Sequence, residues 1–212
     1  MKYLVLILFI GLSLSIPIEA QPSIKKRTSK IKGVSFRGPD EAPLKDEMIA
    51  GVKVIQAEWI SFVPAAILNR YTLAIEPESR RYHWYETKTA IIQSIQMAQS
   101  QGYKIALKPH LKLLPVDSTF QKKLDKTNKA KWRGDIKFDK EEDWQTFETN
   151  YEAFILEWVA IADSLSISLF CVGTELKQFA VKRPQFWQQL INKTREIYNG
   201  QIIYSANWDE YA

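Results

Sequence analysis

Apolar residues recur along this chain in two patterns, helical stripes and short continuous runs. The longest stripe predicts a helix over 141–164, with a capping box formed by Asp139 and Glu142 at its start. Its apolar residues follow one another every three or four positions: Trp144, Phe147, Tyr151, Phe154, Trp158 and Ile161. The next segment, 167–172, is apolar throughout, which is typical of a parallel strand that is covered on both faces.

Weaker patterns of the same two kinds fill most of the remaining chain. Further helices are predicted over 41–50 (ending at Gly51), 87–101 (ending at Gly102) and 184–200. Further strands are predicted over 31–36, 52–63, 103–109 and 202–205. The polar segment 110–140 is predicted to be a long loop.

Strands that alternate with helices indicate an α/β fold with a parallel sheet. Two architectures have this alternation, an open doubly wound sheet and a (β/α)8 barrel. The nucleotide-binding kind of open sheet has a Gly-x-Gly-x-x-Gly turn after its first strand, and Gly33 and Gly38 do not form one. This observation favours a fold of the (β/α)8 TIM-barrel type, with about the first five βα units present, over the nucleotide-binding kind of open sheet.

The N-terminus has the layout of a secretory signal peptide. Lys2 precedes an apolar run, Tyr3–Ile16, and a small residue ends the segment 1–20. An uncleaved membrane anchor is the alternative, but the run is shorter than the ~20 apolar residues that span a bilayer. We expect export to the periplasm or the outside, a flexible leader over 21–30, and one barrel domain over 31–212 without stable membrane insertion.

Composition excludes several classes of protein. With 212 residues, 46% of them hydrophobic, and a single cysteine, the chain is neither disordered nor held together by disulfides. A net charge of +5 spread along the chain does not indicate a nucleic-acid partner. Cys171 and two scattered histidines have no metal-ligand spacing, so no metal and no cofactor are expected. The oligomeric state stays open.

In a barrel, the residues at the carboxyl ends of the strands form the active site. Those that the pattern places at strand ends include Glu58, Trp59, Lys108, His110, Glu175, Asn207 and Trp208. Such a mixture suits a sugar site, because aromatic rings stack on pyranose faces while carboxylates and amides bind hydroxyls. A carboxylic acid there can also protonate a glycosidic oxygen.

Glu175 is the sharpest candidate, because it directly follows a fully apolar strand. Its alternative role is a carboxylate that stabilises the start of a helix. His110 could bind substrate or simply pack with one hydrogen bond. Asn207 and Trp208 could bind sugar, or cap a helix and fill a crevice.

Five segments together resemble the N-terminal part of glycoside hydrolase family 113. They are Lys-Gly-Val-Ser-Phe (32–36), Lys-Pro-His-Leu (108–111), Trp-Arg-Gly-Asp-Ile (132–136), Phe-Cys-Val-Gly-Thr-Glu-Leu (170–176) and Tyr-Ser-Ala-Asn-Trp-Asp (204–209). The resemblance implies a retaining β-mannanase-type barrel whose acid/base is Glu175. It also implies that Lys108, His110, Trp132, Asn207 and Trp208 line the sugar cleft.

The resemblance further implies a secreted enzyme that acts on an oligo- or polysaccharide such as β-1,4-mannan. In that family the nucleophile follows strand seven, whereas this chain ends after strand five. We therefore expect a fragment or a truncated gene product, in which the nucleophile lies beyond residue 212. The alternative function is a non-catalytic saccharide-binding protein or a truncated barrel.

Overall fold

A computed structural model describes residues 30–36, 46–77, 87–113, 130 and 132–210. All helices and strands discussed below lie in the unit Ile31–Ala212. The predicted signal peptide and nearly all of the predicted leader fall outside the described residues. Within the described part of the chain, no helix combines the length and the apolar character needed to cross a membrane.

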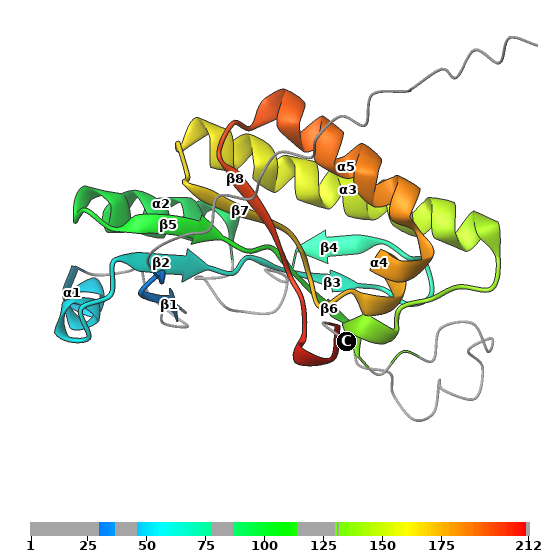
Figure 1. Cartoon of the computed structure of the whole chain (residues 1–212), viewed down its shortest axis with the longest axis horizontal. Helices are drawn as coiled ribbons and strands as arrows, with labels where there is room; N and C mark the ends of the chain where they lie inside the picture. The colour runs from blue at the N-terminus through cyan, green and yellow to red at the C-terminus, as the bar shows by residue number, and fades with distance from the viewer. Residues whose placement is uncertain (1–29, 37–45, 78–86, 114–129, 131, 211–212) are drawn as a thin grey trace, which may run out of the picture. The chain divides into compact units, whose positions relative to one another are not determined.

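Within the described part of the chain, five parallel strands form the main sheet (Figure 1). In spatial order they are β1 (Gly33–Phe36), β2 (Trp59–Phe62), β5 (Lys104–Leu107), β7 (Leu169–Thr174) and β8 (Gln201–Ser205). Every neighbouring pair is parallel, and strand order follows chain order. The predicted parallel α/β sheet is therefore confirmed.

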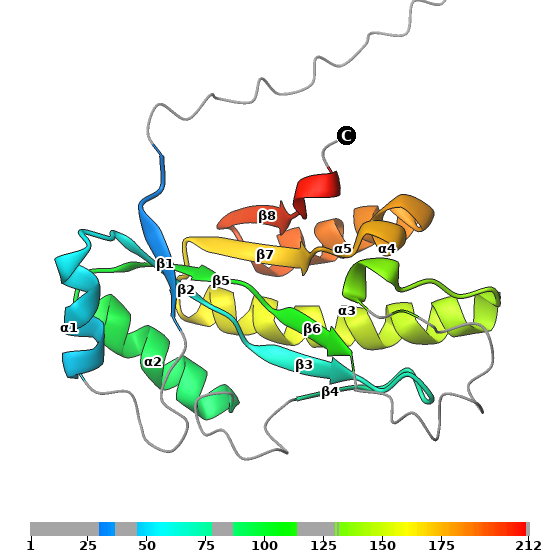
Figure 2. The same cartoon turned by 90° about the horizontal axis from the view of Figure 1, so that it is seen from below.

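A second, three-stranded sheet continues two of these strands. β3 (Ala65–Leu68) follows β2 and β6 (His110–Leu113) follows β5, and β4 (Ile75–Pro77) pairs with β3 (Figure 2). Pro64 and Pro109 interrupt the two strands at matching places, since proline has no N–H to donate. The backbone ladder still crosses the gap, through a hydrogen bond of 2.8 Å from the His110 N–H to the Pro64 carbonyl oxygen.

This second sheet corrects the prediction of a loop over 110–140. The segment begins with strand β6 and contains the 3-10 helix η4 (Arg133–Asp135). Residues 114–129 and 131 of the predicted loop fall outside the described residues. The prediction was wrong at His110 because Pro109 was taken to end the strand, whereas the strand resumes directly after it.

Among the described residues, five α-helices accompany the sheets. They are α1 (Asp46–Val54), α2 (Lys88–Ser100), α3 (Glu141–Ser164), α4 (Lys177–Lys182) and α5 (Pro184–Ile197). The predicted bounds of α3 are confirmed, but its N-cap is Lys140 without a side-chain cap bond, so the predicted capping box is wrong. Helix α4 was not predicted, because a single six-residue turn carries too little periodicity.

Helix α1 corrects two further predictions, a helix end at Gly51 and a strand over 52–63. The helix continues through Gly51 to Val54, and only Trp59–Phe62 forms the strand. Ile49 and Val52 are both buried, three residues apart, so they share the face of α1 that packs on the core. A Cβ at Gly51 would meet no atom within 4 Å, so nothing about this glycine requires a turn.

Three helices end alike, with a residue in the left-handed region that turns the chain into the next strand. Gly102 after α2 has φ 85°, Gln56 after α1 has φ 54° and Ser166 after α3 has φ 50°. After α3, the Ser166 N–H donates to the Asp163 carbonyl and the Ile167 N–H donates to the Ala162 carbonyl, both at 2.9 Å. These paired bonds are those of the Schellman motif.

Helices α3 and α5 pack together against the strands through an aromatic core. Phe179 lies at its centre, with ring centroids 4.9 Å from both Phe147 and Phe186. Tyr151 joins this core to β7, because its buried hydroxyl donates to the Val172 carbonyl at 2.9 Å. The core therefore fixes the position of β7, the strand that leads to Glu175.

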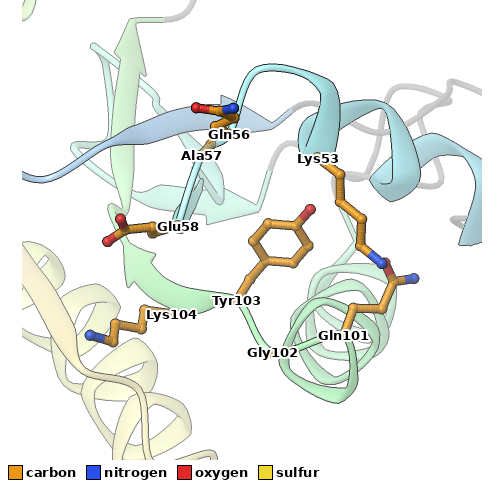
Figure 3. A pocket seen from close by; sticks show the side chains of 8 residues that line it. All are labelled: Lys53, Gln56, Ala57, Glu58, Gln101, Gly102, Tyr103 and Lys104. Atoms are coloured by element: carbon orange, nitrogen blue, oxygen red, sulfur yellow. The ribbon is translucent and has the colours of Figure 1, made fainter.

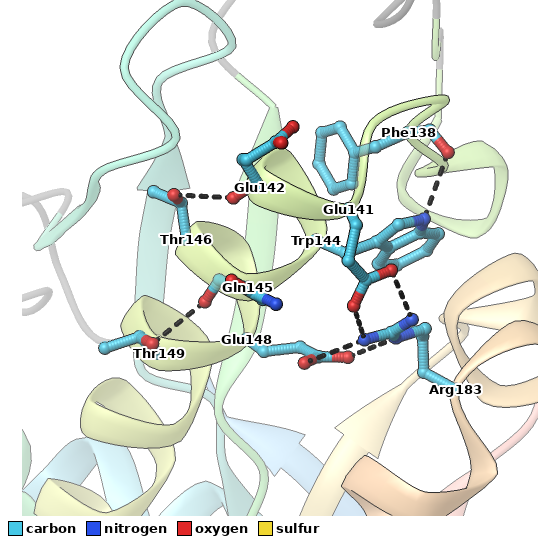
Figure 4. A network of polar contacts seen from close by, with 9 residues as sticks. All are labelled: Phe138, Glu141, Glu142, Trp144, Gln145, Thr146, Glu148, Thr149 and Arg183. Carbon is cyan, nitrogen blue, oxygen red and sulfur yellow. Dashed lines mark hydrogen bonds and ion pairs between the residues drawn. The ribbon is translucent and has the colours of Figure 1, made fainter.

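Arg183 links the start of α3 to the junction of α4 and α5 (Figure 4). Its guanidinium donates to the carboxylates of Glu148 (2.5 Å) and Glu141 (2.7 Å). The same group lies over the Trp144 ring, 5.5 Å from its centroid. The two carboxylates and the ring hold α4 close to α3, directly after the segment that carries Glu175.

Candidate active site

Glu175 directly follows β7, at the carboxyl edge of the main sheet. Its φ of 54° is in the left-handed region, which is strained for a residue with a Cβ. The Glu175 N–H donates to the Ser205 carbonyl at 2.8 Å, and the next N–H, of Leu176, donates to the Tyr204 hydroxyl at 2.7 Å. Strand β8 therefore fixes the backbone on both sides of the carboxylate.

A break in register shapes the strand just before this point. The pairing of β7 with β8 shifts between Cys171 and Gly173. A Cβ at Gly173 would lie 2.6 Å from the Trp187 ring, so only glycine lets that ring pack against the strand. Irregularities of this kind re-aim side chains beside active sites, and here the next side chain but one is that of Glu175.

The carboxylate of Glu175 is ion-paired with Arg133 of η4. The Nη1 atom of Arg133 lies 2.7 Å from Oε2 of Glu175, and the two side chains are 18% and 31% exposed. The Nε atom of Arg133 donates to the Leu111 carbonyl of β6 at 3.0 Å, which fixes the guanidinium from its other side. Burial lowers the pKa of Arg133, and the neighbouring Glu175 partly opposes that effect.

Arg133 was not among the residues predicted for the site. It lies 42 positions from Glu175 along the chain, so no local spacing connects the two. The Trp-Arg-Gly-Asp segment was noticed only as part of the family resemblance. The only local feature that could have suggested a role for Arg133 is its position between an aromatic residue and a glycine in a polar segment.

Trp132 precedes η4, and its ring lies over Gly134. A Cβ built on Gly134 would be 1.9 Å from Cζ3 of that ring, so the close packing requires glycine. The Trp132 side chain is half-buried. The turn that presents Arg133 to Glu175 therefore also fixes the Trp132 ring over Gly134.

Lys108 lies between β5 and β6, and His110 begins β6. Both are half-buried and alternate with the buried residues Leu107, Pro109 and Leu111, so they lie on the opposite face of this extended segment. The Nε2 atom of His110 is buried and has no hydrogen-bond partner. Burial, followed by the charges of Arg133, Lys108 and Lys112, lowers the pKa of His110 to about 4. The imidazole is therefore neutral at neutral pH.

Asn207 and Trp208 follow β8. Asn207 directly precedes the 3-10 helix η5 (Trp208–Glu210), and Trp208 is its first residue. The Glu210 carboxylate holds this turn, because it accepts from the Asn207 N–H (2.7 Å) and from the Tyr204 hydroxyl (2.8 Å). Lys177 of α4 pairs with Asp209 at 2.8 Å. Trp208 is 84% exposed, so its ring fills no crevice between the described elements.

The structure thus brings the predicted residues together in two groups. Glu175 and His110 surround Arg133, with Lys108 on the same strand face as His110 and Trp132 next to Arg133 in the chain. The turn that contains Asn207 and Trp208 is linked to the backbone next to Glu175, because the Tyr204 hydroxyl accepts from the Leu176 N–H and donates to Glu210. No group of three or more potential metal-ligating side chains gathers anywhere in the described ranges.

Two residues predicted at the same rim lie elsewhere. Glu58 directly precedes β2 and Trp59 begins it, so both lie at the amino edge of the sheet, the edge opposite Glu175. The prediction was wrong because the strand was expected to begin at Val52, which is helical. The two residues were therefore predicted near the end of a strand, whereas they lie at its start.

A parallel sheet whose strand order follows chain order, with a carboxylate fixed after its fourth strand, matches part of a (β/α)8 barrel. The chain belongs to glycoside hydrolase family 113, since the model of that family, Glycoside Hydrolase Family 113, matches residues 41–212. No curated protein matches the chain.

Solved structures share the fold. One is the family 113 β-mannanase AaManA from Alicyclobacillus acidocaldarius in complex with ManMIm, at 22% identity and a TM-score of 0.64 over 85% of this chain and 58% of that one. Another is a family 113 β-1,4-mannanase complex, at 22% identity and a TM-score of 0.63 over 83% of this chain and 55% of that one. The chain thus spans little more than half the length of these proteins.

Proposed function

We propose that the protein is a secreted, retaining glycoside hydrolase that cleaves β-1,4-mannan or a related β-linked glycan, with Glu175 as its acid/base. Membership of family 113 and the fold shared with β-mannanases support this proposal. The observation that carries it is the Glu175 carboxylate, which is fixed at the carboxyl edge of the sheet by β8 and by Arg133.

The ion pair assigns different tasks to the two carboxyl oxygens. Arg133 only donates hydrogen bonds, so Oε2, which faces Nη1, stays an acceptor and the transferable proton belongs on Oε1. In the first step Oε1 gives that proton to the leaving glycosidic oxygen while a second carboxylate attacks the anomeric carbon. In the second step, Glu175 is a carboxylate and removes a proton from a water molecule. The oxygen of that water attacks the anomeric carbon, and the bond between the sugar and the second carboxylate breaks.

The attacking carboxylate is assigned to no residue in this chain. Asp209 is paired with Lys177, and Glu210 accepts two hydrogen bonds that hold its own turn. Retaining enzymes place the two carboxyl groups about 5–5.5 Å apart. We therefore place the nucleophile after a later strand of the barrel, close to Oε1 of Glu175.

The remaining predicted residues suit the two chemistries of a sugar. The rings of Trp132 and Trp208 offer apolar faces to pyranose rings. The side chains of Lys108, His110 and Asn207 offer donors and acceptors to hydroxyls. Residues 1–20 fit a signal peptide, which would place the enzyme in the periplasm or outside the cell, where polysaccharides are found.

The test is hydrolysis of β-1,4-mannan by the protein as its gene encodes it, measured as the release of reducing ends. Glu175→Gln removes the transferable proton and should lower the rate by about 10²–10⁴-fold. The matched control is Glu196→Gln, at an exposed glutamate of α5, which should keep the full rate. Full activity of Glu175→Gln, or no release from mannan by the unchanged protein, would contradict the proposal.

A second candidate is a saccharide-binding protein without catalysis. The engagement of both Asp209 and Glu210 in structural contacts favours it, because neither carboxylate is then free to attack a sugar. Binding of mannotetraose to the gene-encoded protein without any turnover, over a broad range of pH, would support this candidate over the first.

A further inference from the structure

Two side-chain links join the segment after β7 to the turn after β8. Tyr204 of β8 makes the first link, because its hydroxyl accepts from the Leu176 N–H at 2.7 Å and donates to the Glu210 carboxylate at 2.8 Å. Lys177 makes the second link, with its ammonium nitrogen 2.8 Å from Oδ2 of Asp209. The segment that begins with the proposed acid/base is therefore tied to the turn that carries two of the predicted sugar-binding residues.

The ring of Tyr204 is held in place by packing. Tyr204 pairs with Gly173 after the register shift, and a Cβ on that glycine would lie only 3.0 Å from Cδ2 of the tyrosine ring. The Trp187 ring meets the Tyr204 ring edge-on, with centroids 5.7 Å apart and an angle of 86° between the planes. These contacts hold the half-buried tyrosine with its hydroxyl at the point where both hydrogen bonds form.

The two hydrogen bonds of this hydroxyl have a fixed direction. Burial and the bond to Glu210 raise the pKa of Tyr204, so the hydroxyl keeps its proton. A backbone N–H only donates and a carboxylate only accepts, so the Tyr204 proton points to Glu210 and a lone pair faces Leu176. The other Glu210 oxygen accepts from the Asn207 N–H at 2.7 Å. A chain of three hydrogen bonds thus runs from one backbone segment to the other, and each bond polarises the next.

Glu175 depends on support of this kind. Its φ of 54° is strained for a residue with a Cβ, so the surrounding contacts must hold the backbone there. The Glu175 N–H donates to the Ser205 carbonyl, a main-chain bond that no side-chain substitution removes. The Leu176 N–H instead depends on the Tyr204 side chain. Without that hydroxyl, the peptide after Glu175 is free to rotate, and the direction of the carboxylate changes with it.

We propose that Tyr204 is a positioning residue, which sets the direction of the Glu175 carboxylate and couples it to the turn that carries Asn207 and Trp208. The effect on catalysis rests on the proposed function, whereas the coupling of the two backbone segments does not. Because such coupling is reciprocal, a sugar that orders the turn also steadies the backbone at Glu175.

Amide hydrogen exchange, followed by NMR in the ¹⁵N-labelled gene-encoded protein, tests the coupling. Tyr204→Phe removes only the hydroxyl and should speed exchange at Leu176 about tenfold. Glu210→Ala removes a carboxylate that is bonded to Tyr204 and Asn207 rather than to Leu176. It should still speed exchange at Leu176, because the hydroxyl loses the acceptor that orients it. An unchanged Leu176 rate in either variant would overturn the coupling.

Two other tyrosines supply matched controls. The buried Tyr198 hydroxyl donates to the Ile167 carbonyl at 2.7 Å, just before β7, so Tyr198→Phe removes a comparable hydrogen bond at the opposite edge of the sheet. Tyr103 precedes β5 at that same edge, and its buried hydroxyl has no partner within the described residues (Figure 3). Neither Tyr198→Phe nor Tyr103→Phe should change exchange at Leu176. A change as large as that in Tyr204→Phe would show general destabilisation instead of coupling.

Two aryl mannosides measure the positioning of Glu175 itself. Phenyl β-mannoside needs a proton on its leaving oxygen, whereas 2,4-dinitrophenyl β-mannoside does not. Tyr204→Phe should lower kcat/KM for the phenyl substrate by about 10–100-fold, because the proton donor is misdirected, and leave that for the dinitrophenyl substrate unchanged. Tyr198→Phe should leave both values unchanged. An equal loss for both substrates in Tyr204→Phe would show a merely structural role.

Glu175→Gln separates a failure of this inference from a failure of the proposed function. A full rate of Tyr204→Phe on phenyl β-mannoside, together with lost activity in Glu175→Gln, would overturn the positioning role and leave the proposed function standing. Full activity in Glu175→Gln, together with faster exchange at Leu176 in Tyr204→Phe and Glu210→Ala, would contradict the proposed function and support the coupling.

Discussion

The neutral state of His110 follows from its surroundings. Its Nε2 is buried, and Arg133, Lys108 and Lys112 place positive charge around the ring, which together lower its pKa to about 4. Because an unfolded chain exposes the same imidazole with an ordinary pKa of 6.5, the unfolded state binds more protons between these two values. The folded state must therefore lose stability as the pH falls from 6.5 towards 4.

His110→Gln tests this linkage, because glutamine does not titrate. The free energy of unfolding of the wild type should fall more steeply than that of the variant between pH 6.5 and 4, by about 3 kcal/mol at most. Urea unfolding at several pH values measures both curves. Parallel curves for wild type and variant would show that the imidazole has an ordinary pKa.

Arg133 is a positioning residue in this account, since it holds one oxygen of Glu175 and itself touches no reacting atom. Arg133→Met should lower the rate of mannan hydrolysis by up to about a hundredfold, because the carboxyl group loses its fixed orientation. Arg133→Lys keeps the charge and should recover part of that loss. The pH–rate profile of Arg133→Met should also differ from that of the wild type. A variant with the same rate and the same profile as the wild type would show that the ion pair does not position Glu175.

At the scale of elements, the helix ends explain where the sequence was informative. Gly102 indicated the end of α2, since glycine takes φ > 0 without strain. Gln56 and Ser166 occupy the same left-handed position after α1 and α3, where neither residue type signals a stop. Gly51 misled the prediction because it lies inside α1 with open space around it.

This comparison predicts that α3 carries removable strain at its end. Ser166→Gly should raise the free energy of unfolding by about 1 kcal/mol, because Ser166 is exposed and its Cβ disfavours the observed φ. Gly102→Ala, at the matching position after α2, should lower it by a similar amount. Chemical denaturation of the two variants measures both changes, and a destabilised Ser166→Gly would contradict this explanation of the turn.

The same scale shows why the second sheet escaped prediction. Pro64 and Pro109 have the properties of strand ends, yet each lies inside a longer extended segment whose ladder continues past it. Only the pairing of β3 with β6 reveals this, and pairing between segments more than 40 residues apart leaves no mark in local sequence.

For the whole molecule, the alternation of strands and helices was sufficient to predict the parallel sheet, because each βα unit leaves its own periodic pattern. The ion pair between Arg133 and Glu175 was not predictable in this way. It depends on η4 folding back over the end of β7, which brings together residues 42 positions apart. The sequence identified the carboxylate, and the fold supplied its partner.

The central claim is that Glu175 donates a proton to the leaving group and later activates water. Azide rescue of Glu175→Ala tests it most directly, with 2,4-dinitrophenyl β-mannoside as substrate for the gene-encoded protein. This leaving group needs no proton, so the mannosyl-enzyme should still form, and azide should then replace water and release β-mannosyl azide. Turnover that rises with azide and yields this product is the predicted result. Turnover of Glu175→Ala that equals that of the wild type without azide, or a product of inverted α configuration, would contradict the claim.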